Sequence, residues 1–198
     1  MAKQQRKLNQ VFICYRRADS SWVASRIYDR LVQKFGRDII FKDIDSIPLG
    51  INFKQYIESV VQQCSVLLVV IHHKWIGESV EPGKSRINDP NDFVRIEIEP
   101  ALKREIPVIP LFIEDAVIPI ENLPETLKEL AARNGMKVNN DPYFHMDMDR
   151  LINHLEPILQ FKKSDLASLK TLMKLAVIFL ASLVIVLLIA TVRILLLK

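Results

Sequence analysis

The stretch SVLLVVI, residues 65–71, decides the fold class of this chain. It is continuously apolar and rich in β-branched residues, a pattern typical of a parallel strand that is buried on both faces. Two further apolar and β-prone stretches, QVFICY at 10–15 and IPVIPLF at 106–112, lie on either side of it in the sequence. The two prolines of the latter favour a strand near the sheet edge or at a strained end. We expect all three stretches to be strands of one sheet.

Amphipathic segments separate these strands. Apolar residues at helical spacing predict three helices. The first has Asp19 as its cap and stops at Gly36, the second carries Phe53 to Val61, and the third spans 92–104. Strand and helix alternate five times, which predicts an α/β fold with a parallel sheet covered by helices on both faces. The weaker elements are strands at 38–41 and 137–138 and helices that open at Pro124 and at Asp147.

Charged residues follow the expected strands, where ligands bind in sheets of this kind. Arg16 and Arg17 follow the first strand, and an acidic pair follows the second. In the helix over 92–104, Glu97 shares a face with Phe93. Arginines suit a pyrophosphate, an aromatic ring suits a flat heterocycle, and a carboxylate can hold ribose hydroxyls. The alternative interpretation is that these charged residues are solvated loop charges and helix-surface ion pairs that bind no ligand.

Several functional classes are disfavoured by the sequence. It contains neither a GxGxxG nor a Walker motif, so the usual nucleotide-binding loops are absent. His72 and His73 lack acidic or cysteine partners at ligand spacing, so we expect no metal site. Cys14 and Cys64 have no neighbouring base, and buried free thiols are favoured over a disulfide. A net charge of +4 without a long basic stripe argues against nucleic acid as a partner.

The last 30 residues are almost entirely apolar. Residues 175–192 carry no charge, and as a helix they would extend roughly 27 Å, close to the thickness of the hydrocarbon core of a bilayer. Lysines cluster just before this stretch, as on the cytoplasmic flank of a membrane span, although a solvated helix face explains Lys162 and Lys163 equally well. The N-terminus has no apolar region of a signal peptide. We therefore expect a single-pass C-terminal anchor in the inner or plasma membrane, with the main domain cytoplasmic.

Three segments resemble, in order and separation, the conserved boxes of TIR (Toll/interleukin-1 receptor) domains. Val11–Arg17, VFICYRR, resembles the first box, with Cys14 where serine is usual. Phe41–Phe53, FKDIDSIPLGINF, resembles the second box and its BB loop. Asn91–Leu102, NDFVRIEIEPAL, followed by IPVIPLFI, resembles the third helix and fourth strand of bacterial members. Together with the apolar C-terminal stretch, the resemblance divides the chain into an N-terminal tail (1–9), a TIR domain (10–160), a basic juxtamembrane linker (161–174) and a transmembrane helix (175–197).

The resemblance implies a fold and an activity. TIR domains have a flavodoxin-like sheet of five parallel strands, which agrees with the element count. Many bacterial and plant TIR domains cleave NAD⁺ into nicotinamide and ADP-ribose or a cyclised form, commonly after neighbouring subunits assemble. The resemblance therefore implies an NAD⁺ glycohydrolase activated by self-assembly, in bacterial defence or signalling, with NAD⁺ as substrate and no cofactor.

The resemblance also implies roles for single residues. The essential glutamate of these enzymes lies in the third helix, in a Trp/Phe–Val–x–x–Glu context, which Phe93, Val94 and Glu97 reproduce here. Glu97 would therefore be the catalytic residue, with Glu99 as its natural control. The residues carried over to substrate binding are Arg16, Arg17, Asp45, Phe53 and Phe93, and those of the assembly loop are Asp43, Ile47, Pro48 and Gly50.

Three other functions compete with this interpretation. A non-catalytic TIR adaptor would signal by homotypic assembly at the membrane, but such domains usually lack the glutamate in this context. A synthase of a cyclic ADP-ribose signal would differ in its product. A receiver domain would need a phosphoacceptor aspartate at the end of the third strand, which ends instead in His72 and His73.

Overall fold

Five parallel strands form one sheet in the order β2-β1-β3-β4-β5, the flavodoxin-like order. The computed structural model describes residues 10–42, 50–78 and 84–159. These lie in the first of two units of the chain, Met1–Leu159 and Gln160–Lys198. The predicted α/β class is confirmed. The strands are β1 (Gln10–Tyr15), β2 (Ile40–Lys42), β3 (Cys64–Ile71), β4 (Val108–Ile113) and β5 (Met136–Val138).

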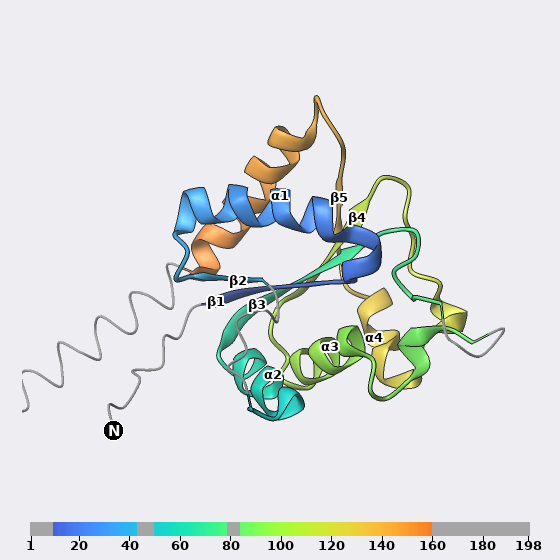
Figure 1. Ribbon diagram of the computed structural model, residues 1–198. Coiled ribbons are helices and arrows are strands. Elements are labelled where there is room, and N and C mark those ends of the chain that lie inside the picture. The colour runs from blue at the N-terminus through green and yellow to red at the C-terminus, as the bar shows by residue number, and fades with distance from the viewer. Residues whose placement is uncertain (1–9, 43–49, 79–83, 160–198) are drawn as a thin grey trace, which may run out of the picture. The chain divides into compact units, whose positions relative to one another are not determined.

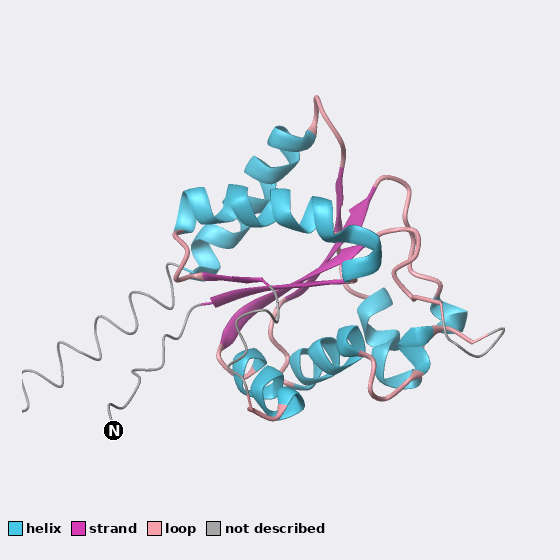
Figure 2. Cartoon of the chain, in the orientation of Figure 1, coloured by secondary structure: helices cyan, strands magenta, loops and turns pink. Residues whose placement is uncertain are grey.

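Helices cover both faces of the sheet, as Figures 1 and 2 show. One face carries α1 (Arg17–Phe35) and a helix over 144–159. The opposite face carries α2 (Phe53–Val61), α3 (Phe93–Lys103) and α4 (Lys128–Ala131). Short 3-10 turns join some of these elements: η2 (Arg86–Asn88), η3 (Ile120–Asn122) and η4 (Glu125–Leu127).

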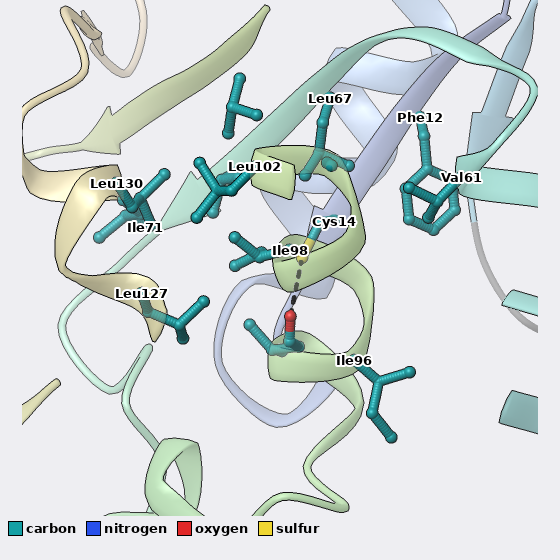
Figure 3. Close-up of a cluster of buried hydrophobic side chains, with 14 of the residues drawn as sticks. Phe12, Cys14, Val61, Leu67, Ile71, Ile96, Ile98, Leu102, Leu127 and Leu130 are labelled. Atoms are coloured by element: carbon teal, nitrogen blue, oxygen red, sulfur yellow. Dashed lines mark hydrogen bonds between the residues drawn. The ribbon is translucent and has the colours of Figure 1, made fainter. Parts of the chain in front are cut away.

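The central strand β3 lies between two apolar clusters because all eight of its residues are buried. Leu67, Val69 and Ile71 point to the cluster beneath α2 and α3, part of which Figure 3 shows. Val66 and Leu68 point to the cluster beneath α1. Burial of each such side chain contributes roughly 1.5–3 kcal/mol. The continuous apolar run that predicted this strand is therefore explained by two buried faces.

The start of α1 differs from the prediction. Asp19 was expected to cap the helix, but the helix begins at Arg17, and its N-cap residue Arg16 makes no side-chain cap hydrogen bond. The carboxylate of Asp19 instead accepts hydrogen bonds from the ring of His72 and from the backbone N–H of Lys74. Tertiary partners after β3 therefore compete successfully for this side chain.

The proline-containing strand β4 lies one position from the sheet edge, as predicted, between β3 and the three-residue β5. A side chain at Gly135 would bring a Cβ to 2.6 Å from the carbonyl oxygen of Pro110 and from Cε2 of Phe112. Glycine at this position therefore permits the close approach of the segment that leads into β5.

The predicted anchor, residues 175–197, its basic linker at 161–174 and the N-terminal tail at 1–9 lie outside the described residues. Among the residues that are described, no helix is both long and apolar enough to cross a membrane.

Candidate functional site

Asp92 organises the N-terminus of α3. Its side chain is fully buried, and Oδ1 accepts a hydrogen bond from the backbone N–H of Arg95, which caps the helix. The guanidinium of Arg16 donates two hydrogen bonds to this carboxylate, from Nη1 at 2.9 Å and from Nη2 at 3.0 Å. Nε of Arg86 lies 3.3 Å from Oδ2 of Asp92. Two cations and a helix cap therefore balance one buried anion.

Arg16 is buried where β1 leads into α1, and its Nε donates to the carbonyl oxygen of Trp75. The bidentate pair with Asp92 thus fixes the end of β1 against α3 and the turn after β3. Gly77, with φ of +69°, packs against the guanidinium: a Cβ there would lie 2.9 Å from Cζ of Arg16. Substrate binding by Arg16 remains a prediction. The contacts of Arg16 described above stabilise the fold.

A cavity of about 250 Å³ opens beside this pair. It is formed by the segments that follow β1 and β3, and Glu97 is not among its lining residues. Its lining mixes three cationic side chains with the carboxylates of Asp19 and Glu78, so its charge does not select an anion. The lining residues are Arg16, Ala18, Asp19, Lys74, Gly77, Glu78 and Arg86.

Glu97 lies in the middle of α3 with 5% of its surface exposed. The helix places it beside Cys14, the fifth residue of β1, whose Sγ also lies 4.0 Å from the carbonyl oxygen of Val94, as Figure 3 shows. Burial first, and then the charge of Glu97 and a hydrogen bond to it, raise the pKa of the Cys14 thiol well above its ordinary value. The thiol is therefore protonated at neutral pH and can donate to the carboxylate.

Phe53 and Phe93 are brought together although they are 40 positions apart in the sequence. Phe53 starts α2, Phe93 starts α3, and their ring centroids lie 4.4 Å apart with planes tilted by 49°. Phe93 is 46% exposed, so one turn before Glu97 the helix presents an aromatic ring to solvent. The two rings therefore contact each other, and their role in substrate binding stays a prediction.

Glu99 occupies a different environment from Glu97. It accepts a hydrogen bond of 2.7 Å from Nε of Arg95 and one of 2.5 Å from the hydroxyl of Thr126 in η4. These contacts tie α3 to η4 and explain Glu99 without any ligand. Its choice as the control residue is therefore reasonable, and glutamine is its best replacement because an amide oxygen can keep accepting both bonds.

The remaining predicted site residues are placed only in part. Arg17 is the exposed first residue of α1. Gly50 has φ of +82°, a conformation that favours glycine. The predictions for the acidic pair and the loop that follows it lie outside the described residues: Asp43, Asp45, Ile47 and Pro48.

Two features of this region escaped the sequence analysis. The first is the role of Asp92, which the sequence marks only as a polar residue before an apolar helical pattern, a typical N-cap signal. The second is Glu114, which follows β4 and lies beside His72 and His73. The two histidines were expected to lack acidic partners. Their neighbours in sequence are indeed not acidic, but in the folded chain Glu114 lies beside both rings. His72, His73 and Glu114 together could hold a metal ion.

Comparison with known proteins assigns the chain to a family. The TIR domain family model matches residues 11–152. No curated protein matches the chain. Among solved structures, the chain is similar to the TIR domains in the structure of the activated Roq1 resistosome directly recognizing the pathogen effector XopQ. The identity is 14% and the TM-score 0.51, over 74% of this chain and 98% of that chain. This similarity concerns the fold alone. Because the family match covers most of the sequence, the chain belongs to the TIR domain family.

Proposed function

We propose that this TIR domain cleaves the N-glycosidic bond of NAD⁺, with Glu97 as the catalytic residue. The observation that carries the proposal is the position of Glu97: a buried carboxylate in α3, one turn after the exposed ring of Phe93. A titratable group held out of water beside an aromatic surface is a candidate for catalysis.

The other buried charges of the described residues have structural explanations. Arg16 and Asp92 pair with each other, and Asp147 accepts hydrogen bonds from the backbone and side-chain nitrogens of Asn139 at 2.9 and 2.8 Å. From β1, the neutral thiol of Cys14 lies beside Glu97 and can donate a hydrogen bond to it. Negative charge at Glu97 is what the proposed reaction requires.

The reaction needs little more than charge stabilisation and positioning. When the bond between C1′ of the ribose and the pyridinium nitrogen breaks, the electron pair goes to nicotinamide, which leaves as a neutral molecule. Positive charge then develops at C1′ and the ring oxygen, and the Glu97 carboxylate stabilises it while accepting hydrogen bonds from ribose hydroxyls. A water molecule attacks C1′ and loses a proton, giving ADP-ribose, or an adenine nitrogen of the same molecule attacks and gives a cyclic product.

Self-assembly would explain how substrate reaches a residue that is 5% exposed. Side chains that cover Glu97 in the single chain must move before a ribose can contact it. Packing of a second copy against the site supplies free energy for such a rearrangement. We therefore include activation by TIR–TIR association in the proposal, and membrane attachment would favour it by raising the local concentration.

The test is NAD⁺ consumption by the full-length chain, solubilised in detergent because of its apolar 175–192 stretch, with products separated by chromatography. Glu97→Ala and Glu99→Ala are measured beside the wild type, the latter as the control two residues away. We expect turnover in the wild type and in Glu99→Ala, and a loss of at least about 100-fold in Glu97→Ala. The product peak distinguishes ADP-ribose from a cyclic form.

Absence of turnover in the wild type, even when the protein is concentrated or crowded to force association, would contradict the enzyme proposal. The non-catalytic adaptor, which acts through homotypic assembly, would then explain the TIR fold without chemistry. Activity that survives in Glu97→Ala would contradict the assignment of the catalytic residue while leaving the activity itself intact.

We also propose that residues 175–197 anchor the domain to the bacterial inner membrane, or to a plasma membrane, with the TIR domain in the cytoplasm. The support is the uncharged run of 18 residues at 175–192 and the lysines that precede it. Resistance of the expressed chain to alkaline carbonate extraction, with loss of the anchor on truncation at 160, is the expected result. Full release of the intact chain by carbonate would contradict it.

A further inference from the structure

We propose that His72, His73 and Glu114 form a binding site for a divalent transition-metal ion of the Zn²⁺ class, with Asp19 as the residue that orients His72. The site lies where β3 and β4 end, and it needs neither Glu97 nor NAD⁺, so it is independent of the proposed function. One potential ligand atom from each of the three residues lies within 4.8 Å of the other two. Two imidazoles and one carboxylate are a donor set that zinc binds, with a water molecule completing the tetrahedron.

The turn after β3 brings the two histidines to one carboxylate. Neighbouring residues of a strand point to opposite faces, but β3 ends at Ile71 and the chain turns at once, with the N–H of Trp75 donating to the carbonyl of His72. The two rings consequently lie with centroids 4.7 Å apart. Nε2 of His73 is 3.3 Å, and Nε2 of His72 is 3.8 Å, from Oε2 of Glu114.

These distances are close to those of an occupied site. Zinc–ligand bonds of about 2.0 Å at tetrahedral angles separate ligand atoms by about 3.3 Å. One pair already has this separation, and the others require small side-chain rotations. A hydrogen bond of 3.0 Å from Nδ2 of Asn140 to Oε1 orients the carboxylate of Glu114 and leaves Oε2 facing the rings. Its backbone has φ of +56°, a strained conformation for a residue other than glycine.

Asp19 fixes the form of His72 that a metal requires. An ionised carboxylate only accepts hydrogen bonds, so Nδ1 of His72, 2.9 Å from Oδ1 of Asp19, carries the proton. In the neutral ring, Nε2 then has its lone pair free and points toward Glu114. The side chain of Asp19 is 5% exposed, and within the described residues its Oδ2 is buried without a hydrogen-bond partner. A carboxylate behind a ligating histidine is the usual outer-shell arrangement of zinc sites.

The nature of the donors selects the class of ion. Mg²⁺ and Ca²⁺ prefer sites built from oxygen ligands alone, whereas imidazole nitrogen favours Zn²⁺ and its transition-metal neighbours. A bound ion would join the ends of β3 and β4 and, through Asp19, the first turn of α1.

The experiment is a titration of the full-length, chelator-treated chain, made without a histidine tag, with Zn²⁺ by calorimetry and with Co²⁺ by visible absorption. We expect one ion per chain and the d–d absorption of four-coordinate Co²⁺. His73→Ala and Glu114→Gln remove ligands and should abolish stoichiometric binding. Asp19→Asn should weaken binding about 10- to 100-fold. His154→Ala, an exposed histidine on the helix over 144–159, should bind like the wild type.

Folding of the variants is checked separately. His73 is 52% exposed, so His73→Ala is expected to unfold at the wild-type temperature when no metal is present. Absence of stoichiometric binding in the wild type would overturn the proposal, as would equal binding by His73→Ala. An equal loss in His154→Ala would show unspecific histidine binding and would overturn it too. Unchanged affinity in Asp19→Asn would overturn the orienting role of Asp19.

Discussion

Asp92 and Glu97 are two buried carboxylates on the same helix, and their surroundings differ. Asp92 caps α3 and is matched by the guanidinium of Arg16, with Arg86 nearby. Glu97, a little more than one turn later, has the neutral thiol of Cys14 beside it and an exposed aromatic ring one turn before it. The surroundings of Asp92 explain it as part of the fold, whereas Glu97 is the carboxylate to which we assign catalysis.

The difference shows that burial of a charge does not by itself identify a site. Three cationic or backbone donors converge on Asp92, so the removal of its charge should damage the fold. If Glu97 is kept for catalysis, the same removal there should leave the fold as stable as before or more stable. The two carboxylates therefore predict opposite patterns of stability and activity.

The largest expected effect on stability is that of Asp92→Asn. Asparagine keeps the helix cap but leaves the guanidinium of Arg16 buried without a counter-charge, so we expect the free energy of unfolding to fall by about 3–5 kcal/mol. Chemical denaturation followed by tryptophan fluorescence measures this, because the side chain of Trp75 is buried in the folded chain and becomes exposed on unfolding. The control is Asp89→Asn, an exposed residue of the same loop. A loss below about 1 kcal/mol at Asp92 would remove the contrast with Glu97.

A smaller effect is expected for Gly77→Ala, which crowds Arg16 without changing any charge. The new Cβ would lie 2.9 Å from Cζ of Arg16, on a backbone with φ of +69°. We expect a loss of about 2–3 kcal/mol, from backbone strain and crowding together. Gly50→Ala separates the two costs, because its φ is +82° but nothing lies within 4 Å of its Cβ. Equal losses in both variants would show that packing on Arg16 contributes nothing.

The smallest effect is expected for Glu99→Gln, and it should depend on pH. Partial burial raises the pKa of Glu99, but hydrogen bonds from Thr126 and Arg95 outweigh it and leave the pKa below its ordinary value. A carboxyl whose pKa is lowered by folding stabilises the fold above its unfolded pKa and loses this contribution as pH falls through its folded pKa. Glu99→Gln should therefore cost below about 1 kcal/mol at pH 7, and this cost should disappear in acid as the pH falls below the folded pKa of Glu99. A difference that persists unchanged in acid would refute the electrostatic explanation.

Much of the fold could be predicted from local patterns. The apolar run at 65–71 corresponds to β3, and the helix predicted over 92–104 corresponds to α3. The buried free thiols of Cys14 and Cys64 were predicted from their apolar neighbours and are confirmed. Asp19 was misassigned as a helix cap because the sequence cannot show that the turn after β3 reaches it.

The site was predictable only where motif and geometry coincide. The resemblance to TIR domains named Phe53, Phe93 and Glu97, and the fold brings the two rings together across α2 and α3. It could not show that Arg16 faces Asp92, 76 positions away, or that Glu114 faces the histidines after β3. Such contacts join the ends of different strands, and only the strand order decides which ends meet.

The most direct test measures NAD⁺ turnover and the free energy of unfolding on the same preparation of Glu97→Gln, beside Glu99→Gln. If Glu97 is kept for catalysis, Glu97→Gln loses at least about 100-fold in turnover while its stability stays equal to or above that of the wild type. Glu99→Gln should retain turnover. A Glu97→Gln variant that turns over NAD⁺ normally but unfolds more easily would contradict the claim and make Glu97 a structural carboxylate like Asp92.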